Sequence, residues 1–150
     1  AENYVKEFPS FYIDIYKRIA AEAVKKGHLA VMEVVTSEKE ALEKTFDPLL
    51  EQKTAGLILI GELNEGYIKA IRGAYDIPIV CVDYYDVYED VDYIITDGFG
   101  GMEQMTRLLL DQGFSDLMFV GTPDGTKNIT DRYLGYCKAL ELAGLEEAQS

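Results

Sequence analysis

The sequence has few of the residues that bind metals or form disulfides, because its 150 residues include only two cysteines and one histidine. Cys81 and Cys137 form no C-x-x-C motif, and His28 is the only histidine that could join them as a metal ligand. Both cysteines lie in apolar patterns. We therefore interpret them as reduced residues that pack in the interior, and we predict no metal site.

Basic residues are also scarce, since 14 lysines and arginines stand against 27 aspartates and glutamates and leave a formal net charge of −13. An acidic surface is repelled by the phosphate backbone of nucleic acids, and the basic residues do not gather into one stripe that could overcome this repulsion. We expect this segment not to contact DNA or RNA.

Long hydrophobic runs are absent. The longest, at residues 57–60 and 77–82, are far shorter than the roughly 18 to 20 residues that cross a bilayer. The start of the chain lacks the basic and apolar regions of a signal peptide, so we expect no membrane partner. The composition, 48% apolar and 27% charged, is typical of a globular domain with one core.

The common catalytic motifs are missing as well. The chain has no G-x-S-x-G, G-x-x-x-x-G-K-S/T or H-E-x-x-H pattern, and the glycines around Phe99 match a dinucleotide fingerprint only in part. His28 follows a glycine in a predicted turn, and we interpret it as a surface residue. We predict no catalytic residue and no cofactor.

Apolar periodicity predicts alternating helices and strands. Thr36 is suited to cap the second helix, and Pro48 is expected to kink it. The segment 84–91 is polar and aromatic and is predicted to be a loop. Helices are expected over 9–26, 38–50, 64–75, 100–112 and 130–143, and strands over 29–35, 55–61, 78–83, 92–96 and 116–121.

The expected strands at 55–61 and 78–83 are almost continuously apolar, which indicates burial on both faces in a parallel sheet covered by helices. We predict a three-layer, Rossmann-like α/β fold that forms one lobe over residues 1–150. Residues 1–7 make a poor strand, so the first strand of the sheet is expected to be missing. The helical side chains expected to face the core are Ala41, Leu42, Phe46, Leu49, Leu50, Tyr67, Ile68, Ile71, Met102, Met105, Leu108 and Leu109.

A binding site in such a fold lies at the carboxyl ends of the strands, where loops and helix N-termini converge. The first helix should start at the same edge, and Arg132 lies one turn into the last helix. Carboxylates, amides and aromatic rings in such a place suit a sugar or another small polar metabolite. The candidate site residues are Ser10, Phe11, Tyr12, Glu62, Asp83, Asp97, Asn128 and Arg132.

Five of the candidates also have a structural interpretation. Asp83 and Asp97 could cap loops or helices, and Phe11 and Tyr12 could belong to the core. Arg132 could form a surface ion pair. The acidic residues between positions 83 and 92 could bind a hard cation, but they lack a glycine-turned ligand spacing and are better interpreted as a solvated loop.

Five segments occur together in a characteristic order. They are 10–12 with the helix that follows, 55–61 (AGLILIG), 77–83 (IPIVCVD), the block starting Thr96-Asp97-Gly98, and 131–136 (DRYLGY). Over nearly all of the chain they resemble the effector-binding domain of LacI/GalR-type transcriptional repressors, which has the periplasmic-binding-protein type I fold. The arginine followed by Gly-Tyr favours the repressor branch over transport receptors.

The resemblance implies the amino-terminal lobe of a two-lobed domain that holds an effector between its lobes. By matching position, it implies that Ser10, Phe11, Tyr12, Asp97, Asn128 and Arg132 line that cleft. Pro9-Ser10 stands where Asn-Pro is common, and Gly98 replaces the usual asparagine. The family also implies a cytoplasmic homodimer that contacts DNA only through a headpiece that this chain lacks, together with most of the second lobe.

The leading hypothesis is therefore a sensor in which a sugar-like effector controls DNA binding allosterically. A sugar-binding receptor of an ABC transporter, with the same fold, is the alternative. A third hypothesis, from another class, is an α/β enzyme with a divalent metal at Asp83 and Asp97.

Overall fold

The computed structural model describes residues 9–42, 54–86 and 91–145. These residues belong to two compact units, the first drawn from Ala1–Val82 and Asp86–Tyr93 and the second from Asp83–Tyr85 and Ile94–Ser150. Residues 1–7, where the first strand was expected to be missing, lie outside the described residues, as do Pro48 and most of the second predicted helix.

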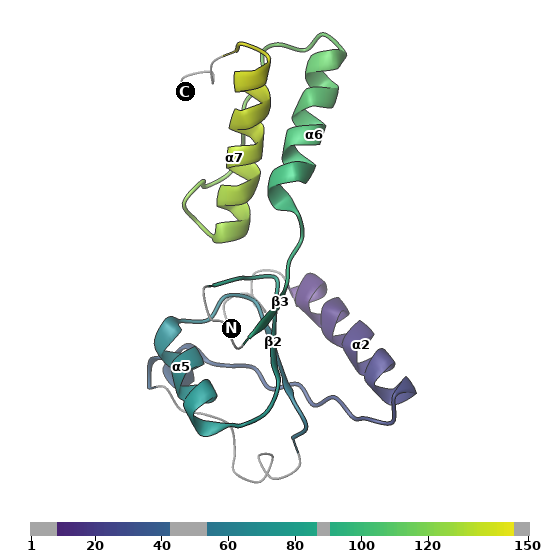
Figure 1. The fold of residues 1–150 in the computed structure, drawn as a ribbon, viewed down its shortest axis with the longest axis vertical. Coiled ribbons are helices and arrows are strands. Elements are labelled where there is room, and N and C mark those ends of the chain that lie inside the picture. Colours follow the sequence, from purple (N-terminus) through teal and green to yellow (C-terminus); the bar gives the residue numbers. More distant parts are fainter. Residues whose placement is uncertain (1–8, 43–53, 87–90, 146–150) are drawn as a thin grey trace. The chain divides into compact units, whose positions relative to one another are not determined.

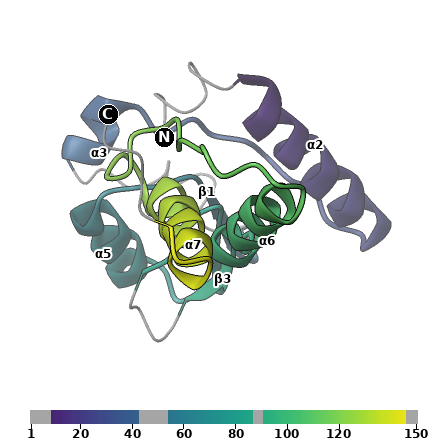
Figure 2. The same ribbon diagram turned by 90° about the horizontal axis from the view of Figure 1, so that it is seen from above.

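The first unit contains a small sheet with helices on both sides. Its helices are α2 (Pro9–Lys25), α3 (Ser37–Ala41) and α5 (Glu65–Ala74), and its strands are β1 (Leu57–Ile60), β2 (Ile79–Val82) and β3 (Asp92–Ile94), which ends at the boundary of the unit. The strand order is β1-β2-β3, and β1 pairs with β2 in parallel, with Leu59 opposite Cys81. Figures 1 and 2 show α2 and α5 on opposite sides of the strands.

The α5 helix supplies three of the largest fully buried side chains of the first unit. Its Tyr67, Ile68 and Ile71 are fully buried, as the spacing predicted. Burial of three large apolar side chains contributes about 1.5–3 kcal/mol each, far more than the helix propensity of ten residues. The Asn64 side chain caps this helix, because its Oδ1 accepts a hydrogen bond of 2.7 Å from the Tyr67 amide.

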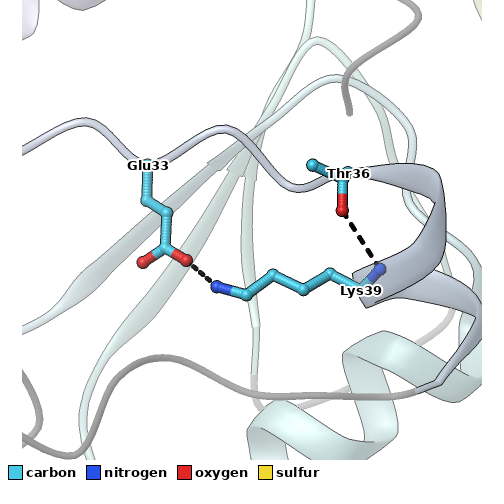
Figure 3. Close-up of polar contacts among 3 residues, drawn as sticks. All are labelled: Glu33, Thr36 and Lys39. Atoms are coloured by element: carbon cyan, nitrogen blue, oxygen red, sulfur yellow. Dashed lines mark hydrogen bonds and ion pairs between the residues drawn. The ribbon is translucent and has the colours of Figure 1, made fainter.

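Polar contacts fasten α3 to its surroundings. Thr36 caps this helix as predicted, with its Oγ1 accepting from the Lys39 amide at 3.2 Å, and the Lys39 ammonium pairs with Glu33 in the preceding segment (Figure 3). The Glu40 carboxylate accepts from the Asn64 amide at 2.6 Å. The start of α5 is therefore tied to α3 by hydrogen bonds as well as by the chain.

The second unit is built on two helices, α6 (Gly98–Asp111) and α7 (Lys127–Leu142), which lie side by side (Figure 1). Their close approach depends on Gly135, which is buried on α7. A Cβ at this position would stand 3.0 Å from the Phe99 carbonyl carbon and 3.1 Å from the Glu103 nitrogen. Gly144, at φ +70°, follows the end of α7 and closes it as predicted.

Two of the five predicted strands are wrong. Residues 29–35 have no regular secondary structure, and Leu29 and Val31 are 88% and 74% exposed. Residues 116–121 are not a strand either. A strand is defined by ladder hydrogen bonds to a neighbour, and neither segment has such a neighbour among the described residues, although its composition suits one.

The segment 116–121 instead packs one face on α7. The Tyr136 hydroxyl donates to the Leu117 carbonyl at 2.8 Å, and the Phe119 ring lies 5.4 Å from the Tyr133 ring. Met118 and Val120 point the other way and are 66% and 85% exposed. The alternation has the period of a strand, which explains why the sequence pattern suggested one.

The predicted burial is also wrong at several positions. Ile79 and Cys81 of β2 are buried, whereas Ile58 of β1 is exposed, so the strands are not buried on both faces. On α6, Met105, Leu108 and Leu109 are exposed and Thr106 is buried instead. The face of α6 that meets α7 is the one at Phe99 and Glu103, which lies against Gly135. The apolar stripe of Met105, Leu108 and Leu109 lies on a different face of α6.

Candidate functional site

The eight candidate residues divide between the two units. Those of the first unit are Ser10, Phe11, Tyr12 and Glu62, and those of the second unit are Asp83, Asp97, Asn128 and Arg132.

The second unit joins Asp83 directly to Asn128. The Asn128 Nδ2 donates to the backbone carbonyl of Asp83 at 2.8 Å and to its Oδ1 at 3.0 Å. Asp83 is the only described residue other than glycine with a positive φ, at 66°, and its amide donates to the Ile94 carbonyl at 2.9 Å. Aspartate tolerates this left-handed backbone better than most residues. Backbone strain of this kind collects at functional sites.

Three residues that the sequence did not single out as site residues complete this cluster. The Tyr85 hydroxyl donates to the Asp131 carboxylate, with oxygen distances of 3.1 and 3.3 Å. The Lys127 ammonium donates to the Tyr85 carbonyl at 2.8 Å and lies 5.3 Å from the centre of its ring. Burial, and then the hydrogen bond to Asp131, raise the pKa of Tyr85. The spacing of Lys127 and Asp131, one helical turn apart, is the signal that could have linked them.

Asp97 caps α6. Its Oδ1 accepts from the Gly100 amide at 2.8 Å, so the structural interpretation of this residue is correct. The carboxylate is nevertheless exposed and remains accessible to other partners.

The start of α6 meets the first turn of α7. A Cβ on Gly98 would lie 3.4 Å from the Arg132 Cγ and 3.5 Å from the Asn128 carbonyl oxygen. Arg132 is exposed, and within the described ranges it forms no ion pair or hydrogen bond. The interpretation of Arg132 as a surface ion pair is therefore wrong.

In the first unit, Ser10, Phe11 and Tyr12 occupy the first turn of α2. Phe11 is 51% exposed and touches the edge of the half-buried Tyr12 ring, with centroids 5.0 Å apart, so Phe11 is not a core residue. Glu62 is half-buried directly after β1, beside Gly61 at φ +80°.

Among the described residues, no three histidines, cysteines, aspartates or glutamates are grouped so that they could hold a metal ion. Both cysteines are free thiols, with Cys81 buried. None of the described helices is both long and apolar enough to span a bilayer.

The arrangement suits recognition rather than bond cleavage. Near the starts of α6 and α7 it presents carboxylates as acceptors, an amide as donor and acceptor, and a guanidinium as a planar donor. Hydroxyl groups of a small molecule are the natural partners of such a set.

Residues 4–150 match the family model described as periplasmic binding proteins and the sugar binding domain of the LacI family. The chain belongs to this family. The match confirms the periplasmic-binding-protein type I fold predicted from the sequence, and it agrees with the parallel pairing of β1 and β2.

Curated transcriptional regulators are similar to this chain over most of its length. The transcriptional repressor PurR of Histophilus somni is 21% identical over 136 residues, which cover 90% of this chain and 41% of the repressor. The chain therefore spans about two fifths of the length of this curated relative. The transcriptional regulator RegA of Clostridium saccharobutylicum is 29% identical over 106 residues, which cover 69% of this chain and 32% of the regulator.

Solved structures show the same fold. The transcriptional regulator CelR in complex with cellobiose matches 98% of this chain and 45% of its own, with 20% identity and a TM-score of 0.77. The regulator CcpA of Lactococcus lactis matches 94% of this chain and 52% of its own, with 21% identity and a TM-score of 0.72.

Proposed function

We propose that this chain is the effector-sensing lobe of a LacI-type transcriptional regulator. A sugar or sugar derivative would bind between this lobe and a second one and would control DNA binding allosterically. The observation that carries the proposal is the polar cluster at the starts of α6 and α7, in a chain whose family is shown over residues 4–150.

Each side chain has a role in this proposal. The Arg132 guanidinium, which has no protein partner among the described residues, donates to ligand oxygens, and the Asp97 carboxylate accepts from ligand hydroxyls. Asn128 and Asp83 hold each other in place and add polar contacts. Ser10, Phe11, Tyr12 and Glu62 belong to the first unit and stay predictions from the sequence.

The regulatory step is a shift of population between an open and a closed form of the two lobes. A sugar that contacts both lobes binds the closed form more tightly and so increases its share. In the whole regulator, which we propose to be a homodimer in the cytoplasm, this closure would move separate DNA-binding heads.

The test uses the full-length regulator and measures operator binding by fluorescence anisotropy in the presence of cellobiose, glucose or ribose. Arg132→Ala should lower the effector affinity about tenfold or more and leave operator binding without sugar unchanged, because a hydrogen bond to a charged group contributes about 1.5–3 kcal/mol. Arg18→Ala is the matched control, since Arg18 is also exposed but lies on α2 of the first unit. An unchanged response of Arg132→Ala to a sugar that acts on the wild type would contradict the assignment of Arg132.

A further inference from the structure

Arg132 is an exposed cation that has a carboxylate close by. A Cβ on Gly98 would lie 3.4 Å from the Arg132 Cγ and 3.6 Å from the Asp131 Cβ. Both side chains therefore flank the first residue of α6. An exposed guanidinium beside a carboxylate would ordinarily spend part of its time paired with it. Within the described residues, however, Arg132 has no such partner.

The Asp131 carboxylate is engaged elsewhere. Both of its oxygens lie within hydrogen-bond distance of the Tyr85 hydroxyl, at 3.1 and 3.3 Å. Tyr85 is itself held in place by Lys127, which contacts both its carbonyl and its ring. Lys127 and Asp131 therefore fix two parts of the same tyrosine from one face of α7.

Because of the geometry of α7, the hydrogen bond between Tyr85 and Asp131 affects whether Asp131 can pair with Arg132. Successive residues of a helix do not face each other, so Asp131 could pair with Arg132 only if its carboxylate left its present position. The hydrogen bond from Tyr85 opposes that movement. Removing the hydroxyl would free the carboxylate and place a competitor next to the guanidinium.

We propose that Tyr85 is a positioning residue, whose hydroxyl holds the Asp131 carboxylate so that the Arg132 guanidinium stays available for the oxygen atoms of a ligand. The binding of a ligand by the Arg132 guanidinium rests on the proposed function. Its availability is a property of this chain alone, and it can be measured without any effector.

The experiment measures how fast phenylglyoxal modifies Arg132 in the 150-residue chain, by peptide mass spectrometry, with Arg18 as the internal reference. Phenylglyoxal reacts with a free guanidinium faster than with a paired one. Tyr85→Phe should slow modification of Arg132 relative to Arg18 about two- to fivefold, the range expected for an exposed ion pair. Adding Asp131→Asn to that variant should restore the wild-type ratio, because the competing charge is gone.

Two controls separate this effect from a general loss of structure. Tyr16→Phe removes a tyrosine hydrogen bond of 3.2 Å in the first unit and should leave the Arg132 rate unchanged. Asp131→Asn alone should also leave it unchanged, and this variant still tests the proposal if Tyr85→Phe does not fold. A rate that rises twofold or more in Asp131→Asn would mean that Asp131 already pairs with Arg132, and the proposal would be wrong.

The remaining outcomes distinguish this proposal from the proposed function. If Tyr85→Phe does not slow the modification, or if the double variant does not recover, the positioning role fails whatever the sugar titrations show. If the rates behave as expected but Arg132→Ala responds to sugar like the wild type, the positioning role stands and the assigned contact between Arg132 and the effector fails.

Discussion

The Asn128 amide bridges two atoms of Asp83, its backbone carbonyl at 2.8 Å and its Oδ1 at 3.0 Å, and Asp83 has a left-handed backbone with φ 66°. One side chain on the first turn of α7 therefore stabilises the turn that directly follows β2. The candidate site is built around this contact, because Lys127 and Asp131 hold Tyr85 two residues later.

Substitution of Asp83 separates the backbone conformation from the side-chain contact. Asp83→Ala and Asp83→Gly both remove the carboxylate, but only alanine has a Cβ that opposes a positive φ. Asp83→Ala should therefore be less stable than Asp83→Gly by about 1–2 kcal/mol in urea unfolding. Equal stability of the two variants would show that the positive φ costs nothing at this position.

Gly135→Ala should destabilise the second unit by about 1–3 kcal/mol, because the new methyl group would meet the α6 backbone at Phe99 and Glu103. Gly73→Ala is the matched control. Gly73 is exposed on α5 with no atom within 4 Å of its Cβ position, so this substitution should stabilise the chain by up to about 1 kcal/mol. Thermal unfolding of both variants measures the difference, and a neutral Gly135→Ala would contradict the close approach of the two helices.

Asp97→Ala should lower stability by about 0.5–2 kcal/mol, because it removes the cap of α6. Asp97→Asn should be nearly neutral, since asparagine also accepts a hydrogen bond from the Gly100 amide. Urea unfolding and sugar titration of these two variants separate the role of Asp97 as a helix cap from the role of its charge. Weaker sugar binding by a fully stable Asp97→Asn would indicate that the carboxylate contacts the effector, whereas unchanged binding would leave Asp97 a cap alone.

Tyr67→Phe should be neutral or stabilising at pH 7, by up to about 1–3 kcal/mol. The Tyr67 side chain is fully buried on α5, and its hydroxyl has no hydrogen-bond partner among the described residues. Phenylalanine keeps the ring and removes the unsatisfied polar atom. Urea unfolding of the two proteins tests this, and a loss of more than 1 kcal/mol would indicate that the hydroxyl has a partner.

Tyr67 should also make the stability of the folded chain depend on pH. Burial, followed by the nearby Glu33, Tyr75 and Glu40, raises the pKa of Tyr67 from 10.0 to about 12. The folded protein therefore keeps this proton to a higher pH than the unfolded chain does. Between pH 10 and 12 the wild type should lose stability relative to Tyr67→Phe, by at most about 1.4 kcal/mol per pH unit. Parallel unfolding curves of the two proteins across this range would contradict the shift.

Local patterns were enough to predict much of this molecule. The helical spacing of apolar residues located α2, α5 and α7, and the runs around Leu59 and Cys81 located β1 and β2. Helix caps such as Thr36 could also be predicted from the sequence, because a cap depends on residues within one turn. The family could be recognised from five segments in order, and the match over residues 4–150 confirms it.

Contacts between distant segments could not be read in this way. The partners of Asn128 and Asp131 lie more than forty positions earlier in the chain, at Asp83 and Tyr85, and no local periodicity connects them. The same limit explains the errors at 29–35 and 116–121, where the composition suited a strand but a strand also needs a neighbour. Residue order therefore specifies which helices form, because the hydrogen bonds and caps of a helix are local. Only the tertiary structure brings the start of α7 against residues 83–85, and this contact decides which polar side chains of the candidate site meet.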